Sequence, residues 1–158
     1  MVKVLFVCLG NICRSPLAEA LFNHKIKELG LAGKVMADSC GTGNYHIGSQ
    51  PDKRSIQVAH KHHVSINHAC RQLVRSDLVD FDYVLAMDRS NYQNILILAA
   101  KPEQHKKVLL MRSFDKSDDL DEVPDPYHGG PKEFQDVYDI LNRSIDGFID
   151  HLTKKHFC

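Results

Sequence analysis

A cysteine and an arginine six positions apart are the residues of this chain best suited to chemistry. Cys8 ends the apolar run 2–7, and Arg14 follows a short loop that contains Gly10. A loop between a strand and a helix directs backbone N–H groups and a helix N-terminus at one point, which favours a bound oxyanion. The same field favours a thiolate, and a guanidinium matches two oxygens of a tetrahedral anion. The pattern predicts a nucleophile inside an anion site, as phosphoryl transfer requires.

Ser15 and Pro16 fit the start of a helix directly after this loop. Ser15 is a favourable N-cap residue, and Pro16 suits a first helical turn because its missing N–H needs no partner there. The alternative is that Cys8 only closes a buried strand, since free cysteine is among the most buried residue types. A plain core requires neither the glycine nor the arginine, so the anion site is favoured.

The acidic segment from 113 to 131 is where a proton donor for a leaving oxygen is expected. Asp125 lies between Pro124 and Pro126, whose rings restrict the backbone and hold the carboxylate in one extended pose. Pro-Asp-Pro is also an ordinary rigid turn, and this alternative stays open. The remaining acidic residues are interpreted as a solvated surface loop: Asp115, Asp118, Asp119, Asp121 and Glu122.

Apolar runs that alternate with helical patterns predict an α/β domain with a parallel sheet. Ligands of such sheets bind beyond the carboxyl ends of the strands, so Cys8, Ser39 and Asp88, which each follow a predicted strand, are expected to face one crevice. Strands are predicted at 2–7, 35–37, 81–87 and 108–111, and helices at 16–29, 51–62, 90–100 and 134–152.

The 158 residues fit one domain, 1–158, and 20 basic residues balance 20 acidic ones. This balance argues against nucleic-acid or membrane partners. The five cysteines, at 8, 13, 40, 70 and 158, have no disulfide-framework spacing, which favours a reducing cytoplasm. No cysteine pair has zinc-site spacing, and His60, His62 and His63 are interpreted as a solvated helix end, so no metal is expected.

Two motifs carry a resemblance to a known family. The stretch 4–16 reads VLFVCLGNICRSP, and 125–127 reads DPY. Together they resemble the low molecular weight protein tyrosine phosphatases, and the similarity covers essentially the whole chain in the right order. The resemblance implies a single α/β domain in which helices flank both sides of a central four-stranded parallel sheet, with a phosphate-binding loop after the first strand. Further matching segments are Tyr45–Gly48, Pro51–Asp52, His68 with Arg71–Gln72, and Phe81–Tyr83 with Met87–Asp88.

The resemblance also implies a two-step hydrolysis without a cofactor. Cys8 attacks phosphorus, Arg14 and the loop amides hold the phosphoryl oxygens, and Asp125 protonates the departing phenolate and then activates water. Phosphotyrosine-containing proteins are the implied partners, phosphate is the product and a competing ligand, and a monomer capable of weak self-association is expected. The implied phosphate-binding residues are Leu9, Gly10, Asn11, Ile12, Cys13, Arg14 and Ser15.

Residues around the loop match supporting positions of the family. Asn11, Ser15, Ser39 and His68 would brace the loop by hydrogen bonds, with Asn11 in a left-handed conformation that asparagine tolerates. His68 could instead be an ordinary core or surface histidine. Asp88 could cap the following helix, and a role near the site is the second interpretation of this residue.

Cys13 matches a family cysteine that forms a disulfide with Cys8 under oxidant, which would protect the nucleophile from irreversible oxidation. The alternative is that Cys13 only packs under the loop.

The resemblance implies that Leu9, Ile12, Tyr45 and Tyr127 line the pocket mouth as walls for an aromatic group. His128 stands where the family often has a second aromatic residue.

Three other classes of protein compete with a tyrosine phosphatase. Arginine phosphatases of this fold tend to carry threonine at the place of Ile12. Arsenate reductases need two further cysteines, and 71–100 contains none. A phosphate-binding module or a redox sensor would not need Asp125.

Overall fold

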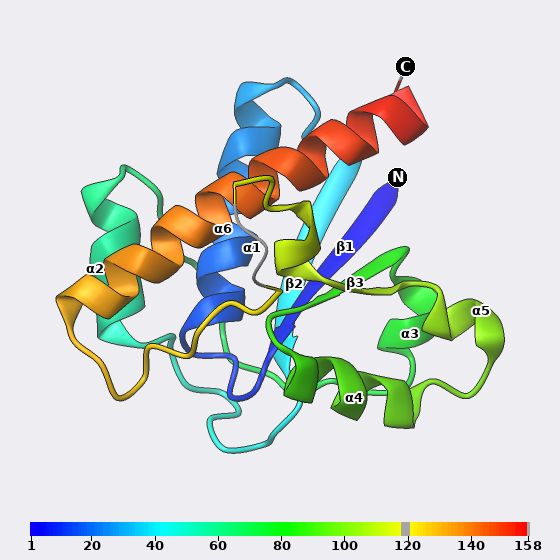
Figure 1. Ribbon diagram of the computed structural model, residues 1–158, viewed down its shortest axis with the longest axis horizontal. Coiled ribbons are helices and arrows are strands. Elements are labelled where there is room, and N and C mark those ends of the chain that lie inside the picture. The colour runs from blue at the N-terminus through cyan, green and yellow to red at the C-terminus, as the bar shows by residue number, and fades with distance from the viewer. Residues whose placement is uncertain (118–120, 158) are drawn as a thin grey trace.

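Four short strands form one parallel sheet through the centre of the molecule (Figure 1). The computed structural model describes residues 1–117 and 121–157, so Asp118, Asp119 and Cys158 fall outside the described residues. The strands are β1 (Val2–Cys8), β2 (Val35–Gly41), β3 (Tyr83–Ala86) and β4 (Val108–Leu110). Their spatial order is β2-β1-β3-β4. The chain therefore leaves β1 toward one edge and later fills the other side, and such switch points are where open parallel sheets bind ligands.

Helices cover both faces of this sheet (Figure 1). This architecture confirms the predicted α/β fold with a four-stranded parallel sheet. A 3₁₀ turn (Met111–Phe114) follows β4, and a π-helical turn (Thr153–Phe157) ends the described chain. Helices α1 (Arg14–Glu28), α2 (Lys53–Lys61) and α6 (Pro131–Leu152) lie on one side; α3 (Asp77–Asp80) and α4 (Arg89–Leu98) lie on the other, and α5 (Pro102–His105) precedes β4.

Strand β1 is buried on both faces, which explains its nearly continuous apolar sequence. Phe6 faces the larger core, where its ring lies 5.6 Å from that of Phe22 on α1. Leu5 and Val7 belong to the smaller core, together with Ile95 of α4. The alternation of side chains along the strand thus fixes β1 between two layers, and its C-terminal residue Cys8 is held in a constant position.

Several predicted boundaries were wrong. Strand β2 continues to Gly41, so Ser39 lies inside a strand and not after one. Helix α1 begins at Arg14, and α6 begins at Pro131. The four-residue helices α3 and α5 were not predicted, because a single turn is too short to show helical periodicity. Among the described residues, no helix combines the length and apolar character that a membrane span requires.

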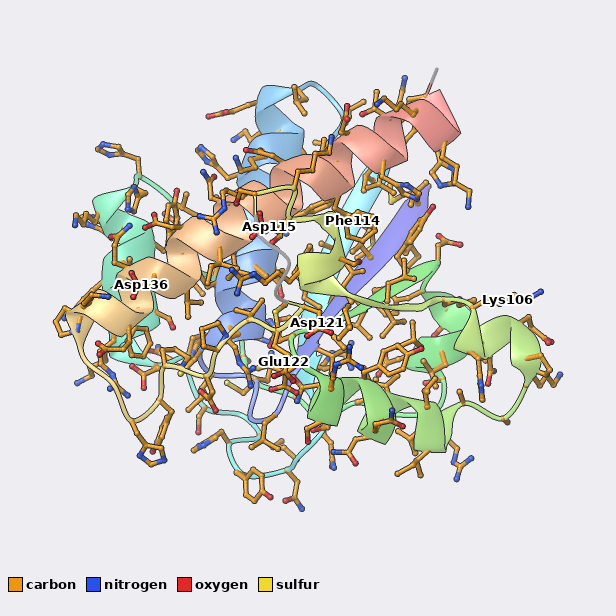
Figure 2. All side chains as sticks on the ribbon, viewed as in Figure 1. Lys106, Phe114, Asp115, Asp121, Glu122 and Asp136 are labelled. Atoms are coloured by element: carbon orange, nitrogen blue, oxygen red, sulfur yellow. The ribbon has the colours of Figure 1, made fainter. Side chains whose placement is uncertain are left out.

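Asp115 is buried, which corrects its interpretation as part of a solvated loop. Its carboxylate accepts hydrogen bonds from Arg112, from Arg143 of α6 at 3.2 Å and from the Ser117 hydroxyl at 2.8 Å. Burial raises the pKa of Asp115, but the bonds from Arg143 and Ser117 outweigh burial and lower it to about 2. Figure 2 shows Asp115 and Phe114 beside α6.

This cluster joins the segment after β4 to α6. The approach is close at Gly147, where a Cβ atom would lie 2.1 Å from the carbonyl oxygen of Phe114. Farther along the segment, Asp121 pairs with Arg89, and Glu122 accepts a bond from the Arg89 N–H at 2.9 Å (Figure 2). The acidic segment is thus held at several points before it reaches Asp125.

Asp115→Asn is expected to lower the free energy of unfolding at pH 7 by about 3 kcal/mol, because it removes the buried carboxylate that pairs with the buried Arg112 and the exposed Arg143. Because the folded-state pKa of Asp115 is depressed, its contribution is present above pH ~4 and disappears as the pH falls toward 2. Urea unfolding between pH 7 and 2 measures both effects. Asp136→Asn, which removes an exposed pair with Lys132, is the matched control. Equal losses in the two variants would contradict the prediction.

Candidate active site

The loop from Cys8 to Ser15 connects β1 to α1, and its carbonyl groups are bound by the surrounding structure. The N–H groups of Thr42 and Gly43 donate to the carbonyls of Cys8 and Leu9, both at 2.9 Å. The carbonyl of Ile12 accepts from the Asp52 N–H at 2.8 Å. Because C=O and N–H of a trans peptide point in opposite directions, these bonds leave the loop N–H groups directed away from their partners, toward the cavity side.

Two backbone features permit this tight path. Asn11 has a φ of 58°, the left-handed conformation that the sequence predicted, and the Cys70 thiol donates to its carbonyl at 2.9 Å. Gly41, at the end of β2, packs directly under the loop, where a Cβ atom would lie 2.6 Å from the carbonyl oxygen of Leu9. A side chain at position 41 would therefore displace the loop.

The loop forms the floor of a cavity of about 370 Å³. Cys8 lies there with 3% of its surface exposed, and its Sγ is 3.0 Å from Oγ of Ser15. Helix α1 starts at the same point and carries no acidic residue in its first turn. An anion in the cavity would meet the positive end of the helix and no opposing carboxylate of that turn. The lining residues are Cys8, Leu9, Gly10, Ile12, Cys13, Arg14, Tyr45, His46, Asp125, Tyr127 and His128.

Arg14 is buried and held by two partners at its Nη1. That nitrogen donates to Oδ2 of Asp88 at 2.7 Å and to the carbonyl of Val123 at 2.9 Å. Burial lowers the pKa of the Arg14 guanidinium, but Cys8 and Asp88 raise it more, so the net shift is upward. Asp88 also caps α4, since its Oδ1 accepts from the Asn91 N–H at 2.8 Å. Asp88 therefore caps α4 and also pairs with the guanidinium of Arg14.

Asn11 is the centre of the predicted bracing network. Its Oδ1 accepts from the Arg71 N–H at 3.0 Å, which fixes the orientation of the amide, and from Nε2 of His68 at 2.7 Å. Its Nδ2 donates to Ser15 at 2.8 Å and to Ser39 at 3.1 Å. The four residues predicted to brace the loop are thus in contact. His68 lies on the outer side of this network, where its Nε2 contacts Asn11 and its Nδ1 contacts Glu19.

Ser15 does not cap α1, which corrects the sequence prediction. The helix begins at Arg14, its N-cap residue is Cys13, and no side chain bonds to its first N–H groups. The Ser15 hydroxyl instead lies between Cys8 and Asn11. The uncapped N–H groups stay available to a ligand, because a cap would have occupied the anion site.

Glu19 belongs to the network although sequence reasoning missed it. It accepts from Ser39 at 2.8 Å and lies 3.2 Å from Nδ1 of His68. Its position four residues after Ser15 on α1 is the signal that could have found it. The possible metal-ligand atoms of Glu19, Asp38 and His68 lie within 4.8 Å of one another. The Glu19 and His68 atoms contact each other, and Asp38 binds Arg71 at 2.9 Å, so the group serves to brace the loop.

Asp125 is 47% exposed at the cavity edge, and its Oδ2 is 3.8 Å from Nη2 of Arg14. Its Oδ1 accepts from the Tyr127 N–H at 3.1 Å. The Pro-Asp-Pro segment therefore presents a carboxylate to the cavity, and the turn follows it at 127–128.

The predicted mouth residues surround the same opening. Leu9, Tyr45, Tyr127 and His128 are exposed, and Ile12 is half-buried. His46 is an additional rim residue that sequence reasoning missed. A Cβ atom on Gly10 would lie 3.1 Å from Cδ2 of this imidazole, so the glycine leaves room for it. His46 lies inside the segment Tyr45–Gly48 that matches the family, but no residue pattern assigned its side chain to the rim.

Cys13 lines the cavity as a buried thiol. Burial is the main cause that raises its pKa to about 12, and the nearby Asp52 adds to the effect. Burial also raises the pKa of Cys40 and of Cys70. These three cysteines are therefore thiols at neutral pH.

Comparisons with known proteins agree with this geometry. Residues 3–157 match the family model described as low molecular weight phosphotyrosine protein phosphatase. A relative of that name from Schizosaccharomyces pombe is 44% identical over 154 residues, which cover 96% of this chain and 97% of the relative. A protein tyrosine phosphatase from Entamoeba histolytica, crystallised with Hepes in its active site, superimposes with a TM-score of 0.94 at 40% identity and 98% coverage of both chains.

A Drosophila arginine phosphatase also shares the fold, with a TM-score of 0.90, 32% identity and coverage of 99% of this chain and 100% of that one. Fold, site and relatives together define a hydrolase of phosphate monoesters. The chain belongs to the low molecular weight phosphotyrosine protein phosphatase family.

Proposed function

We propose that this protein hydrolyses phosphotyrosine in proteins, and small aryl phosphates, through a phosphocysteine intermediate on Cys8. The observation that supports this proposal best is the cavity, which brings Cys8, Arg14 and Asp125 together although Arg14 and Asp125 lie 111 positions apart in the sequence. A buried sulfur, a buried guanidinium and an exposed carboxyl group occupy the floor, the side and the edge of one pocket. This order matches a nucleophile, an oxyanion holder and a proton donor that reaches the leaving group.

In the first step, Sγ of Cys8 as a thiolate attacks phosphorus, so that an S–P bond forms while the P–O bond to the phenol breaks. Asp125, protonated at the start, transfers its proton to the departing oxygen. Arg14 and the loop N–H groups hold the phosphoryl oxygens, where negative charge gathers in the transition state. The Ser15 hydroxyl, 3.0 Å from Sγ, stabilises the thiolate before attack and as it departs in the second step.

In the second step, water attacks the phosphocysteine. Asp125, now a carboxylate, takes a proton from this water, the S–P bond breaks, and phosphate leaves with the thiolate restored. The exposed position of Asp125 suits both steps, because solvent water reaches the same edge from which the phenol departs. Phosphate is therefore both the product and a competing ligand of the loop.

Apolar and aromatic side chains at the mouth favour a phenyl leaving group. Leu9 and Tyr127 are each 42% exposed, and Tyr45 is 68% exposed, so their faces are free to pack on a ring. Arginine phosphatase activity is the second candidate, because the Drosophila neighbour bears that name. Ile12 favours the phenyl ring, since an apolar wall gives a cationic guanidine no hydrogen bond.

We also propose a reversible redox switch between Cys8 and Cys13, which line one cavity. A peroxide oxidises the Cys8 thiolate to a sulfenic acid, and the Cys13 sulfur then displaces water to form the disulfide. A thiol reductant restores both cysteines. Cys8, Cys13, Cys40 and Cys70 are all free, as a reducing compartment would keep them, and a cytoplasmic monomer is the setting we propose.

Cys8→Ser is expected to abolish hydrolysis, because an alcohol is a poor nucleophile without a nearby base.

Asp125→Asn keeps the oxygen that accepts the Tyr127 N–H but removes the acid. We expect kcat/KM to fall roughly hundredfold for phenyl phosphate and much less for p-nitrophenyl phosphate, whose phenolate leaves without a proton. Steady-state assays near pH 5.5 measure both. Phosphate binding with no turnover in the unaltered protein would mean a binding module and not an enzyme.

A phosphotyrosine peptide is expected to have a kcat/KM at least roughly tenfold above that of the matched phosphoarginine peptide. Ile12→Thr should narrow this ratio, because the hydroxyl gives the guanidine a partner. Phosphate release from the two peptides, under identical conditions, gives the ratio. A preference of the unaltered protein for phosphoarginine would contradict the proposed substrate class.

Peroxide inactivation is expected to be reversible by dithiothreitol in the unaltered protein and irreversible in Cys13→Ser. Peptide mass mapping should find the Cys8–Cys13 disulfide in the treated protein. Cys40→Ala, a change in the core, is the control and should recover like the unaltered protein. Recovery of Cys13→Ser to the same extent, or absence of the disulfide, would rule the switch out.

A further inference from the structure

Arg54, in the first turn of α2, uses its whole guanidinium to join three segments. Its Nε and Nη2 donate to the two carboxylate oxygens of Asp52, at 3.0 and 2.9 Å. Its Nη1 donates to the carbonyl of Gly129 at 3.0 Å, and Nη2 donates also to the carbonyl of Tyr127 at 2.9 Å. The guanidinium carbon lies 4.5 Å from the centre of the Phe134 ring. A planar fork that is bound on both edges and one face has little freedom to move.

The start of α2 is itself bound to the phosphate-binding loop. The Asp52 N–H donates to the carbonyl of Ile12 at 2.8 Å, and the Ser55 hydroxyl donates to the carbonyl of Cys13 at 3.1 Å. Asp52 also caps α2 by accepting from the Arg54 N–H at 2.8 Å. Arg54 is therefore fixed in the frame of the loop that carries Cys8.

The other side of Arg54 holds the segment that carries Asp125. Tyr127 accepts a hydrogen bond from Arg54 at its carbonyl, and its own N–H donates to Oδ1 of Asp125. The far end of the segment is anchored at Val123, whose N–H donates to the carbonyl of Met87 at 2.8 Å. Between these anchors the Asp125 side chain is half-exposed, so local burial does not fix its position.

We propose that Arg54 is a positioning residue that sets the place of Asp125 relative to Cys8. The connection runs from the loop through Asp52 and Arg54 to the backbone of Tyr127, and from there to the Asp125 carboxyl group. This inference rests on the proposed role of Asp125 as the proton donor. The charge of Arg54 is already matched by Asp52, whose pKa the Arg54 hydrogen bond lowers, so Arg54 acts through geometry and not as a free cation over the site.

A double-mutant cycle tests whether the effect of Arg54 passes through Asp125. Arg54→Gln, Asp125→Asn and the double variant are compared by kcat/KM for phenyl phosphate and p-nitrophenyl phosphate. Arg54→Gln alone is expected to lose about tenfold on phenyl phosphate, since a misplaced catalytic group loses rate steeply, and less than about threefold on p-nitrophenyl phosphate. In the Asp125→Asn background, Arg54→Gln should cause no further loss, because the proton donor is already absent.

Arg54→Lys keeps the charge near Phe134 but cannot bind Asp52 and two carbonyls at once, so it should show the same pattern in weaker form. It also serves if Arg54→Gln fails to fold, which thermal unfolding reports. Arg75→Gln, a change of an exposed arginine, is the matched control and should leave every rate unchanged.

Equal fold-losses from Arg54→Gln in both backgrounds, or on both substrates, would overturn the inference, since a general effect on folding or on the phosphate loop predicts that result. If Asp125→Asn itself were fully active, the proposed proton donor would be wrong, and the inference would fail with it. The two failures are therefore distinguishable. A loss that occurs only when Asp125 is unaltered, and only with phenyl phosphate, supports Arg54 as the positioning residue.

Discussion

The loop from Cys8 to Ser15 must keep its N–H groups directed at one point, and much of the surrounding structure meets this requirement. An unliganded set of converging N–H dipoles is unfavourable, because neighbouring peptides would relax toward other partners. Here the opposite ends of those peptides are bound by the backbone after β2, by the Asp52 N–H and by the Cys70 thiol. These bonds hold the loop in its path without a ligand.

Arg14 and Asp88 are likewise held in place by bonds to the surrounding structure. A buried guanidinium is costly unless it is paired, and Arg14 meets this condition through Asp88 and the Val123 carbonyl. Both partners bind Nη1, whereas Nη2 faces Asp125 across the cavity. The pairing therefore holds the guanidinium in place by one edge. Asp88 is in turn fixed as the cap of α4, so the second layer of helices contributes directly to the geometry of the site.

Two loops distant in sequence meet at this cavity, and their separation sets the distance between Asp125 and Cys8. The acidic segment is anchored to α6 through Asp115, to α4 through Arg89, and to α2 through Arg54. Each anchor is an ionic or charge-assisted contact with the backbone or with a carboxylate, and such contacts have directional geometry that apolar packing lacks. The exposed Asp125 thus obtains a defined position without being buried.

The sequence alone predicted the class of enzyme and the class of fold, because Cys8, Arg14 and their loop lie within eight contiguous residues and the strand and helix patterns are local. Tertiary structure decided the rest. Ser15 bonds to sulfur and not to the helix end, Asp115 is buried, and Arg54 joins two loops only because the fold brings 52–55 beside 127–129. Local propensity holds no information about such partners, since each bond depends on where a distant backbone comes to lie.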